Sequence, residues 1–288
     1  MMQKNITYYP VLLLLAVVLF ACCADDEQSD ADTQPFLAFD VTEQPWEEES
    51  LLLTRATTDT ERGLKDSSIG FELFCLDLNI SNQQVKWRSE SGLWDVEQKV
   101  LWLKKTASVD VYAYAPWESA TALSDKKISF SCPSDNETDL LWASHENVSR
   151  NDGTANLTFR HALAKLSFGT ITNNYGRDLT LTDISLTGFY PSGTLSLVDG
   201  EWTLGTEELQ DISRTPTSPG LMVANGETRA LGAASILQIP ASVTITFKFT
   251  TTDFGTETAT FNVSLAKGEN KTLNLTITNN FEVVITNP

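Results

Sequence analysis

Alternation of apolar and polar residues with a period of two is the feature of this sequence that most limits its fold. The alternating runs are rich in Thr, Val, Ile and aromatic residues, which is typical of strands with one buried face. They lie at residues 109–115, 156–161, 179–186, 243–249 and 272–277. No helical-period stretch of comparable length accompanies them. Many short strands of this kind predict an all-β protein built from β-sandwiches.

Turn residues separate the strands and indicate two domains. Asp199 and Gly200 stand between two alternating runs and form a two-residue hairpin signal. The chain after the first 35 residues is long enough for one large or two ordinary domains. The Asn-Asp-Gly loop at residues 151–153 is the candidate boundary, so we expect an N-terminal domain at 36–152 and a C-terminal domain at 153–288.

The N-terminus has the features of a lipoprotein signal peptide, residues 1–21. Lys4 precedes an apolar run at residues 11–20, which is too short to span a bilayer and right for a secretory signal. Ala21 and Cys22 resemble the lipobox of bacterial signal peptidase II, which needs a small residue before the cut and a thiol after it. This predicts lipidation, with palmitate, at Cys22. An ordinary secretory signal is the alternative.

Acidic residues dominate the chain and its start. The formal net charge is −18 at pH 7, which repels phosphate backbones and argues against a nucleic acid partner. Residues 22–35 form an acidic tether. Asp25, Asp26 and Glu27 resemble the export signal that sends lipoproteins of Bacteroides-type bacteria to the outer face of the outer membrane. A solvated, unstructured tether is the alternative interpretation.

The cysteines and histidines offer no catalytic or metal-binding pattern. Cys75 and Cys132 lie far apart; outside the cytoplasm they are a candidate disulfide, with two buried free thiols as the alternative. His145 and His161 have no second ligand at metal-site spacing, and we interpret His161 as a structural residue near the sheet. No nucleophile elbow or phosphate-binding glycine loop is present. We therefore expect no enzyme, no cofactor and no metal.

Three segments in series carry a resemblance to a known family. Residues 109–116 (VDVYAYAP), 139–144 (DLLWAS) and 157–166 (LTFRHALAKL) resemble the signature of the fimbrillin (Mfa-like) family, the pilus subunits and related surface lipoproteins of Bacteroides-type bacteria. Residues 184–188 and 193–197 resemble its second domain. The resemblance implies two tandem transthyretin-like β-sandwich domains and a subunit or minor component of a type V pilus that serves adhesion.

The resemblance also implies a maturation site. Residues 49–56 (ESLLLTRA) resemble the site where an arginine-specific protease cuts fimbrillin precursors, here between Arg55 and Ala56. Losing the leader and its first strand would leave a groove that a neighbouring pilus subunit fills by β-strand addition. The lipid would anchor the chain to the outer membrane before maturation, and the mature chain would lie in the fimbrium. A chain never cut at Arg55 is the alternative.

Two further alternatives concern the end of the chain and its ligands. Residues 280–288 are either the strand that is donated to a neighbour or the last strand of the second domain. The chain is either a pilus component or a monomeric surface lipoprotein that binds glycans or host ligands. In the second case Trp87, Trp94, Trp102 and Trp117 would form a sugar-stacking platform, although most tryptophans of a sandwich serve its core.

Overall fold

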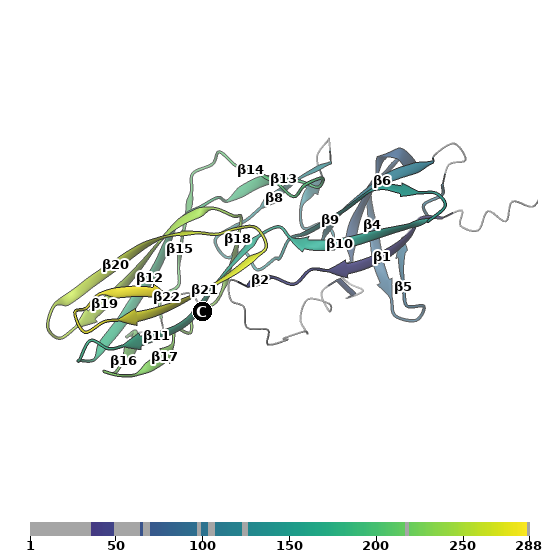
Figure 1. The fold of residues 1–288 in the computed structure, drawn as a ribbon. Helices are drawn as coiled ribbons and strands as arrows, with labels where there is room; N and C mark the ends of the chain where they lie inside the picture. Colours follow the sequence, from purple (N-terminus) through teal and green to yellow (C-terminus); the bar gives the residue numbers. More distant parts are fainter. Residues whose placement is uncertain are drawn as a thin grey trace, which may run out of the picture. The chain divides into compact units, whose positions relative to one another are not determined.

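The computed structural model describes residues 36–48, 64–65, 70–96, 99–102, 107–122, 126–216 and 219–286. The predicted signal peptide, the tether, Cys22, Arg55 and Ala56 lie outside the described residues. Residues 36–288 form one compact unit of β-sheets, and the prediction of an all-β sandwich protein is confirmed (Figure 1). In the described part of the chain, no helix is both long enough and apolar enough to cross a membrane.

A seven-stranded sheet forms the first half of the unit. Its strands, in spatial order, are β1 (Ala38–Glu43), β10 (Thr154–His161), β9 (Leu141–Ser149), β6 (Ser108–Ala115), β3 (Phe71–Cys75), β4 (Ile80–Arg88) and β5 (Leu93–Val96). A short 3-10 helix, η1 (Leu76–Leu78), follows β3. The predicted strands at 109–115 and 156–161 are β6 and β10. Strand β10 alternates as expected, whereas β6 is buried on both faces over its second half.

A four-stranded sheet explains that double burial, because it covers the other face of β6. It comprises β14 (Trp202–Leu204), β13 (Ser192–Ser196), β8 (Lys127–Ser131) and β7 (Thr121–Ala122). Tyr112 and Tyr114 of β6 pack in one buried cluster with Phe130 of β8 and Leu195 of β13. A hairpin at Asp199 and Gly200 is confirmed, since this turn connects the paired strands β13 and β14, but its loop is residues 197–201 and not the two residues predicted.

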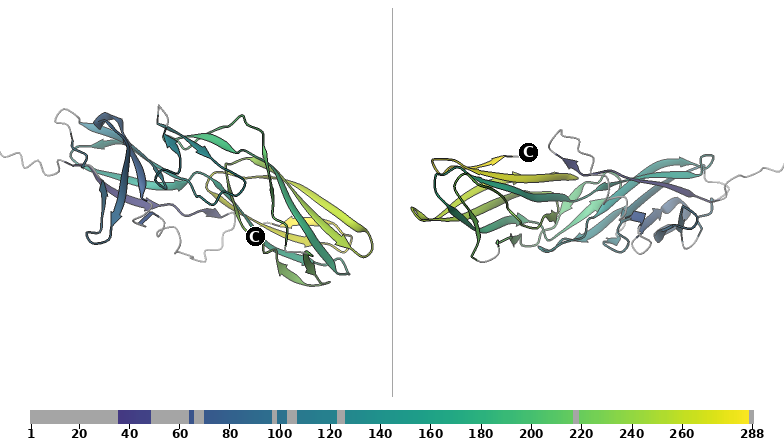
Figure 2. Two further views of the ribbon diagram at one scale, coloured as in Figure 1. Left: turned by 180° about the vertical axis from the view of Figure 1, so that it is seen from behind. Right: turned by 90° about the horizontal axis from the view of Figure 1, so that it is seen from below.

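Two further sheets enclose the second core (Figure 2). One contains β17 (Thr228–Ala230), β11 (Ala164–Asn173), β21 (Glu269–Ile277) and β2 (Glu47–Glu48), with β18 (Ile236–Gln238) on β11 and β22 (Val283–Thr286) on β21. The other contains β15 (Gln210–Ser213), β12 (Leu179–Phe189), β19 (Ser242–Thr251) and β20 (Gly255–Ser264), with β16 (Leu221–Val223) on β12. The predicted strands at 179–186, 243–249 and 272–277 are β12, β19 and β21.

The sheets do not divide at the loop of residues 151–153. That loop is the turn between β9 and β10, and both strands belong to the seven-stranded sheet. The chain passes to the second core at Ala162 and Leu163, just before β11. Strand β13, from later in the chain, returns to pair with β8. A strong turn signal marks a hairpin as readily as a domain boundary, and here it marks the hairpin between β9 and β10.

A buried carboxyl group in β3 makes stability depend on pH. Glu72 is 3% exposed and accepts a hydrogen bond from the Tyr114 hydroxyl. Desolvation by burial raises the pKa of Glu72 above its usual value. The folded state therefore holds the proton of Glu72 more tightly than the unfolded state does. The contribution of this proton to the free energy of unfolding is complete below the unfolded pKa and is lost as the pH rises through the folded pKa.

We expect Glu72→Gln to raise the melting temperature at pH 7 relative to the wild type. At pH 4, where both chains carry a neutral side chain at this position, the difference should be much smaller. Thermal unfolding at several pH values measures it, with the exposed Glu137→Gln as the control. If the Glu72→Gln chain and the wild type lost the same stability between pH 4 and pH 7, the assignment of this pH dependence to Glu72 would be contradicted.

Candidate functional site

The segment at residues 36–48, called the leader segment below, forms an edge of both halves of the unit. Its first part, β1, pairs in parallel with β10 from Ala38 opposite Thr154 to Glu43 opposite Phe159. Its last part, β2, pairs in parallel with β21, with Glu47 opposite Glu269. The purple ribbon in Figure 1 shows this single segment running from the first sheet to the second. One stretch of chain therefore completes two sheets.

The apolar side chains of β1 and of Leu37, the residue before it, pack into the core of the seven-stranded sheet, called the first core below. Leu37 is 4% exposed, and Phe39 and Val41 are half-buried against the same cluster. The Phe39 ring meets the Phe71 ring edge to face, with the centroids 6.3 Å apart. The alternate residues, Ala38, Asp40 and Thr42, are exposed. The period of two in β1 thus separates a core face from a solvent face.

Backbone hydrogen bonds hold the leader segment along its length. Four of its amides donate to carbonyl oxygens elsewhere in the unit, at N···O distances of 2.8–2.9 Å: Leu37 to Val100, Ala38 to Gly153, Gln44 to Phe159 and Glu47 to Gly268. Removing the segment would leave these carbonyl groups, and one whole edge of β10, without their partners. Unpaired edges of this kind are templates for another strand.

Trp46 lies between β1 and β2 and stacks on His161. The two ring centroids are 3.8 Å apart, and the ring planes differ by 17°. The His161 side chain is 1% exposed; its Nδ1 lies 2.8 Å from Oδ2 of Asp139, whereas its Nε2 has no hydrogen-bond partner. The Lys165 ammonium group lies 6.0 Å from the centre of the Trp46 ring. Trp46 therefore covers the ring of a histidine that makes a hydrogen bond through Nδ1 but not through Nε2.

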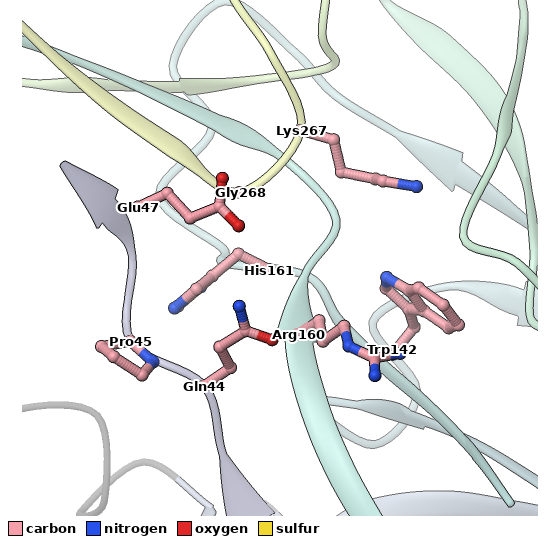
Figure 3. Close-up of a pocket in the computed structure, with 8 residues that line it drawn as sticks. All are labelled: Gln44, Pro45, Glu47, Trp142, Arg160, His161, Lys267 and Gly268. Carbon is pink, nitrogen blue, oxygen red and sulfur yellow. The ribbon is translucent and has the colours of Figure 1, made fainter. Parts of the chain in front are cut away.

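A pocket opens beside this stack. Figure 3 shows Gln44, Pro45 and Glu47 of the leader segment on one wall, with Trp142, Arg160, His161, Lys267 and Gly268 on the others. Arg160 and Lys267 both lie over the Trp142 ring, at 5.4 Å and 5.6 Å from its centre. Lys267 also donates to the Gly200 carbonyl oxygen, at 2.7 Å. The wall opposite the leader segment is thus cationic and aromatic.

The C-terminal strand shares an edge of β21 with the leader segment. Strand β22 pairs antiparallel with β21, from Val283 opposite Ile277 to Thr286 opposite Asn274. Strand β11 occupies the other edge of β21, so β2 and β22 lie on the same edge. The Phe281 ring, just before β22, packs against Tyr175 with centroids 5.0 Å apart. The structure therefore has β22 as the last strand of the sheet that contains β21, the second of the two alternatives for residues 280–288.

The family model described as fimbrillin-like matches residues 41–287 of this sequence. The chain belongs to the fimbrillin-like family. A fimbrial protein from Bacteroides vulgatus has a similar crystal structure, with a TM-score of 0.61 and 16% identity over 88% of this chain and 98% of the other. A candidate cell adhesion protein from Bacteroides uniformis gives a TM-score of 0.57 and 16% identity over 88% and 99%. No curated protein sequence gives a significant match.

The two cysteines of this fimbrillin-like chain that the structure describes are both free. Cys75 is buried in the core of the seven-stranded sheet, and Cys132 is buried in the cluster beneath the four-stranded sheet. Burial raises the pKa of each thiol to about 12. Because both thiols are free, the structure contains no disulfide between Cys75 and Cys132 and has the alternative, two buried thiols.

The histidines and tryptophans of the fimbrillin-like chain have structural contacts. His145 Nδ1 accepts a hydrogen bond from the Asn156 amide, at 2.8 Å. The described ranges contain no group of three or more His, Cys, Asp or Glu side chains that could hold a metal ion. Trp102 is 5% exposed, and Trp94 packs on Phe71 with centroids 5.2 Å apart. Trp87, Trp94, Trp102 and Trp117 therefore do not present one exposed platform for a sugar.

Sequence reasoning missed strand β2 and the Trp46–His161 stack. Strand β2 has only two residues, too few for an alternating pattern. The sequence signal that could have indicated this site is Pro45, which interrupts the strand pattern and is followed directly by the aromatic residue Trp46.

Proposed function

We propose that this chain is a structural subunit or minor component of a type V pilus that serves adhesion at the cell surface. It is exported as a lipoprotein, lipidated at Cys22, cut between Arg55 and Ala56, and assembled by donor-strand exchange with other pilus subunits. The observation that carries the proposal is the position of the leader segment. Both β1 and β2 precede Arg55 in the chain, so a cut there separates an edge strand of each half from the rest.

The chemistry of the exposed edge supports strand exchange. Loss of β1 uncovers the edge of β10 and the part of the first core that Leu37, Phe39 and Val41 cover. Apolar area exposed to water costs roughly 25 cal/mol per Å², and unpaired backbone groups add to that cost. A strand that repeats the alternation of β1 removes both costs at once, which favours assembly over an open groove.

The C-terminal segment of a second copy has the required pattern. Phe281, Val283 and Ile285 alternate with polar or exposed residues, as Phe39 and Val41 do in β1. Aligning Phe281 with Phe39 sets Val283 in the place of Val41 and puts the carboxylates of Glu282 and Asp40 on the same, exposed face. Before it can be donated, β22 must leave its own β21.

The proposed partners and location follow from the same route. The lipid on Cys22 anchors the precursor in the outer membrane, and the acidic tether directs it to the outer face. An arginine-specific protease releases it, and the mature chain joins the fimbrium, where it meets host or bacterial surface ligands. Membership in the fimbrillin-like family supports a structural role without catalysis.

The test is the N-terminus of the protein recovered from the surface of its native cells, measured by intact mass. We expect a chain that begins at Ala56 and runs as high-mass ladders without heating. A chain that begins at an acylated Cys22 and stays monomeric would overturn the proposal. A monomeric lipoprotein that binds glycans or host ligands would then be the better description.

A further inference from the structure

We propose that the chain binds its own leader segment after the cut, with Trp46 as the anchor, so that proteolysis does not by itself open the groove. The inference rests on the maturation step proposed above. The occupant is residues 36–48, which the structure holds in place.

The contacts of the leader segment do not depend on the peptide bond after Arg55. The pairing of β1 with β10, the four backbone hydrogen bonds and the burial of Leu37 all involve residues before position 49. Cutting the chain beyond this segment removes none of them. The cut changes only the connection, from one chain to two chains that must dissociate.

Trp46 is the contact that joins the two ends of this segment. Its ring lies flat on His161, whose side chain is 1% exposed and whose Nε2 is unpartnered. Glu47 next to it pairs with β21, on the other half of the unit. Departure of Trp46 would expose the His161 ring and its unpartnered nitrogen to the pocket of Figure 3.

The incoming strand described above cannot replace this anchor. With Phe281 in the place of Phe39, Asn287 and Pro288 fall at the places of Pro45 and Trp46. Neither residue carries an aromatic ring that could stack on His161. The donated strand therefore competes for the groove of β1 but not for the Trp46 site. The leader segment keeps its contact with His161 through Trp46 while β1 is displaced.

The experiment follows the leader after a cut made in vitro. The purified full-length chain is treated with an arginine-specific protease, the cut is verified by intact mass, and the leader is then followed by gel filtration over time. We expect the wild-type leader to co-elute with the rest of the chain. Trp46→Ala should release it about tenfold faster, because an aromatic contact and its burial are lost, and Trp46→Phe should restore most of the retention.

The matched control is Asp40→Ala, in the same segment but on its exposed face. It should release the leader at the wild-type rate. Appearance of the wild-type leader in the low-mass fraction as soon as the bond is cut would overturn the proposal. Equal release rates for Trp46→Ala and Asp40→Ala would overturn the role of Trp46. Because the cut is made in vitro, either result is distinct from failure of the maturation step in cells.

Discussion

An Arg55→Ala chain is expected to stay monomeric in cells that assemble the wild-type chain into ladders. Without this arginine the proposed cut between residues 55 and 56 cannot be made, and β1 and β2 stay covalently attached. A tethered strand returns to its own groove far faster than a strand from another molecule can enter, since its effective concentration there is in the millimolar range. The acceptor edge of β10 therefore remains closed. The measurement is the mobility of unheated surface protein on a denaturing gel.

Arg62→Ala is the control, because it removes a nearby arginine and leaves Arg55 in place. It should assemble like the wild type. Ladders from Arg55→Ala as abundant as those of the wild type would contradict both the cut and its role.

A cysteine pair reports the strand alignment in the same experiment. With Phe281 in the place of Phe39, Val284 takes the place of Thr42, whose hydroxyl lies 3.2 Å from that of Thr158. A chain with Val284→Cys and Thr158→Cys should then form disulfides between subunits after maturation, and none when Arg55→Ala is added. In the uncut monomer Val284 lies opposite Thr276, so Val284→Cys with Thr276→Cys should instead close within one chain.

Gly200→Ala is expected to lower the free energy of unfolding by about 3 kcal/mol. Gly200 has a φ of +71°, a conformation that costs a residue with a side chain roughly 1–2 kcal/mol. An added Cβ would also lie 2.2 Å from Cζ2 of Trp142. Trp142 cannot move aside freely, because Arg160 and Lys267 lie over its ring. Denaturant unfolding measures the loss.

Gly255→Ala separates the two causes of that loss. Gly255 has a φ of +72°, and an added Cβ would meet nothing within 4 Å. This variant should therefore show only the conformational cost, about 1 kcal/mol. Equal losses for the two variants would mean that the Trp142 ring is not held in place.

The sequence predicted the strands of the cores well and the ends of the chain poorly, for a physical reason. Strands such as β10 and β19 have one face in a core and one in water, so apolar and polar residues alternate along them and the strands can be recognised from the sequence. Strand β6 escapes that rule in part, because a second sheet covers it. Which strands lie side by side is not encoded in the period, and the return of β13 to β8 could not be inferred.

The candidate site was predictable as a position and not as a set of contacts. The residues before Arg55 were expected to supply a removable first strand, and β1 has the alternation for it. That the same segment continues past Pro45 into a second sheet depends on long-range pairing with β21. The stack of Trp46 on His161 joins residues more than a hundred positions apart, and no local pattern reports such a contact.

The shared edge of β21 has a consequence for the kinetics of fibre growth. Under the proposed strand exchange, β22 must first leave β21 and the leader segment must first leave β10, so two separate releases precede the first link between chains. By the same proposed route, a newly exported chain with both strands still paired would resist self-association even where it is crowded. Growth should show a lag that fibre ends with an open acceptor shorten, because the first link at such an end needs only one release, that of β22 from β21 in the arriving chain.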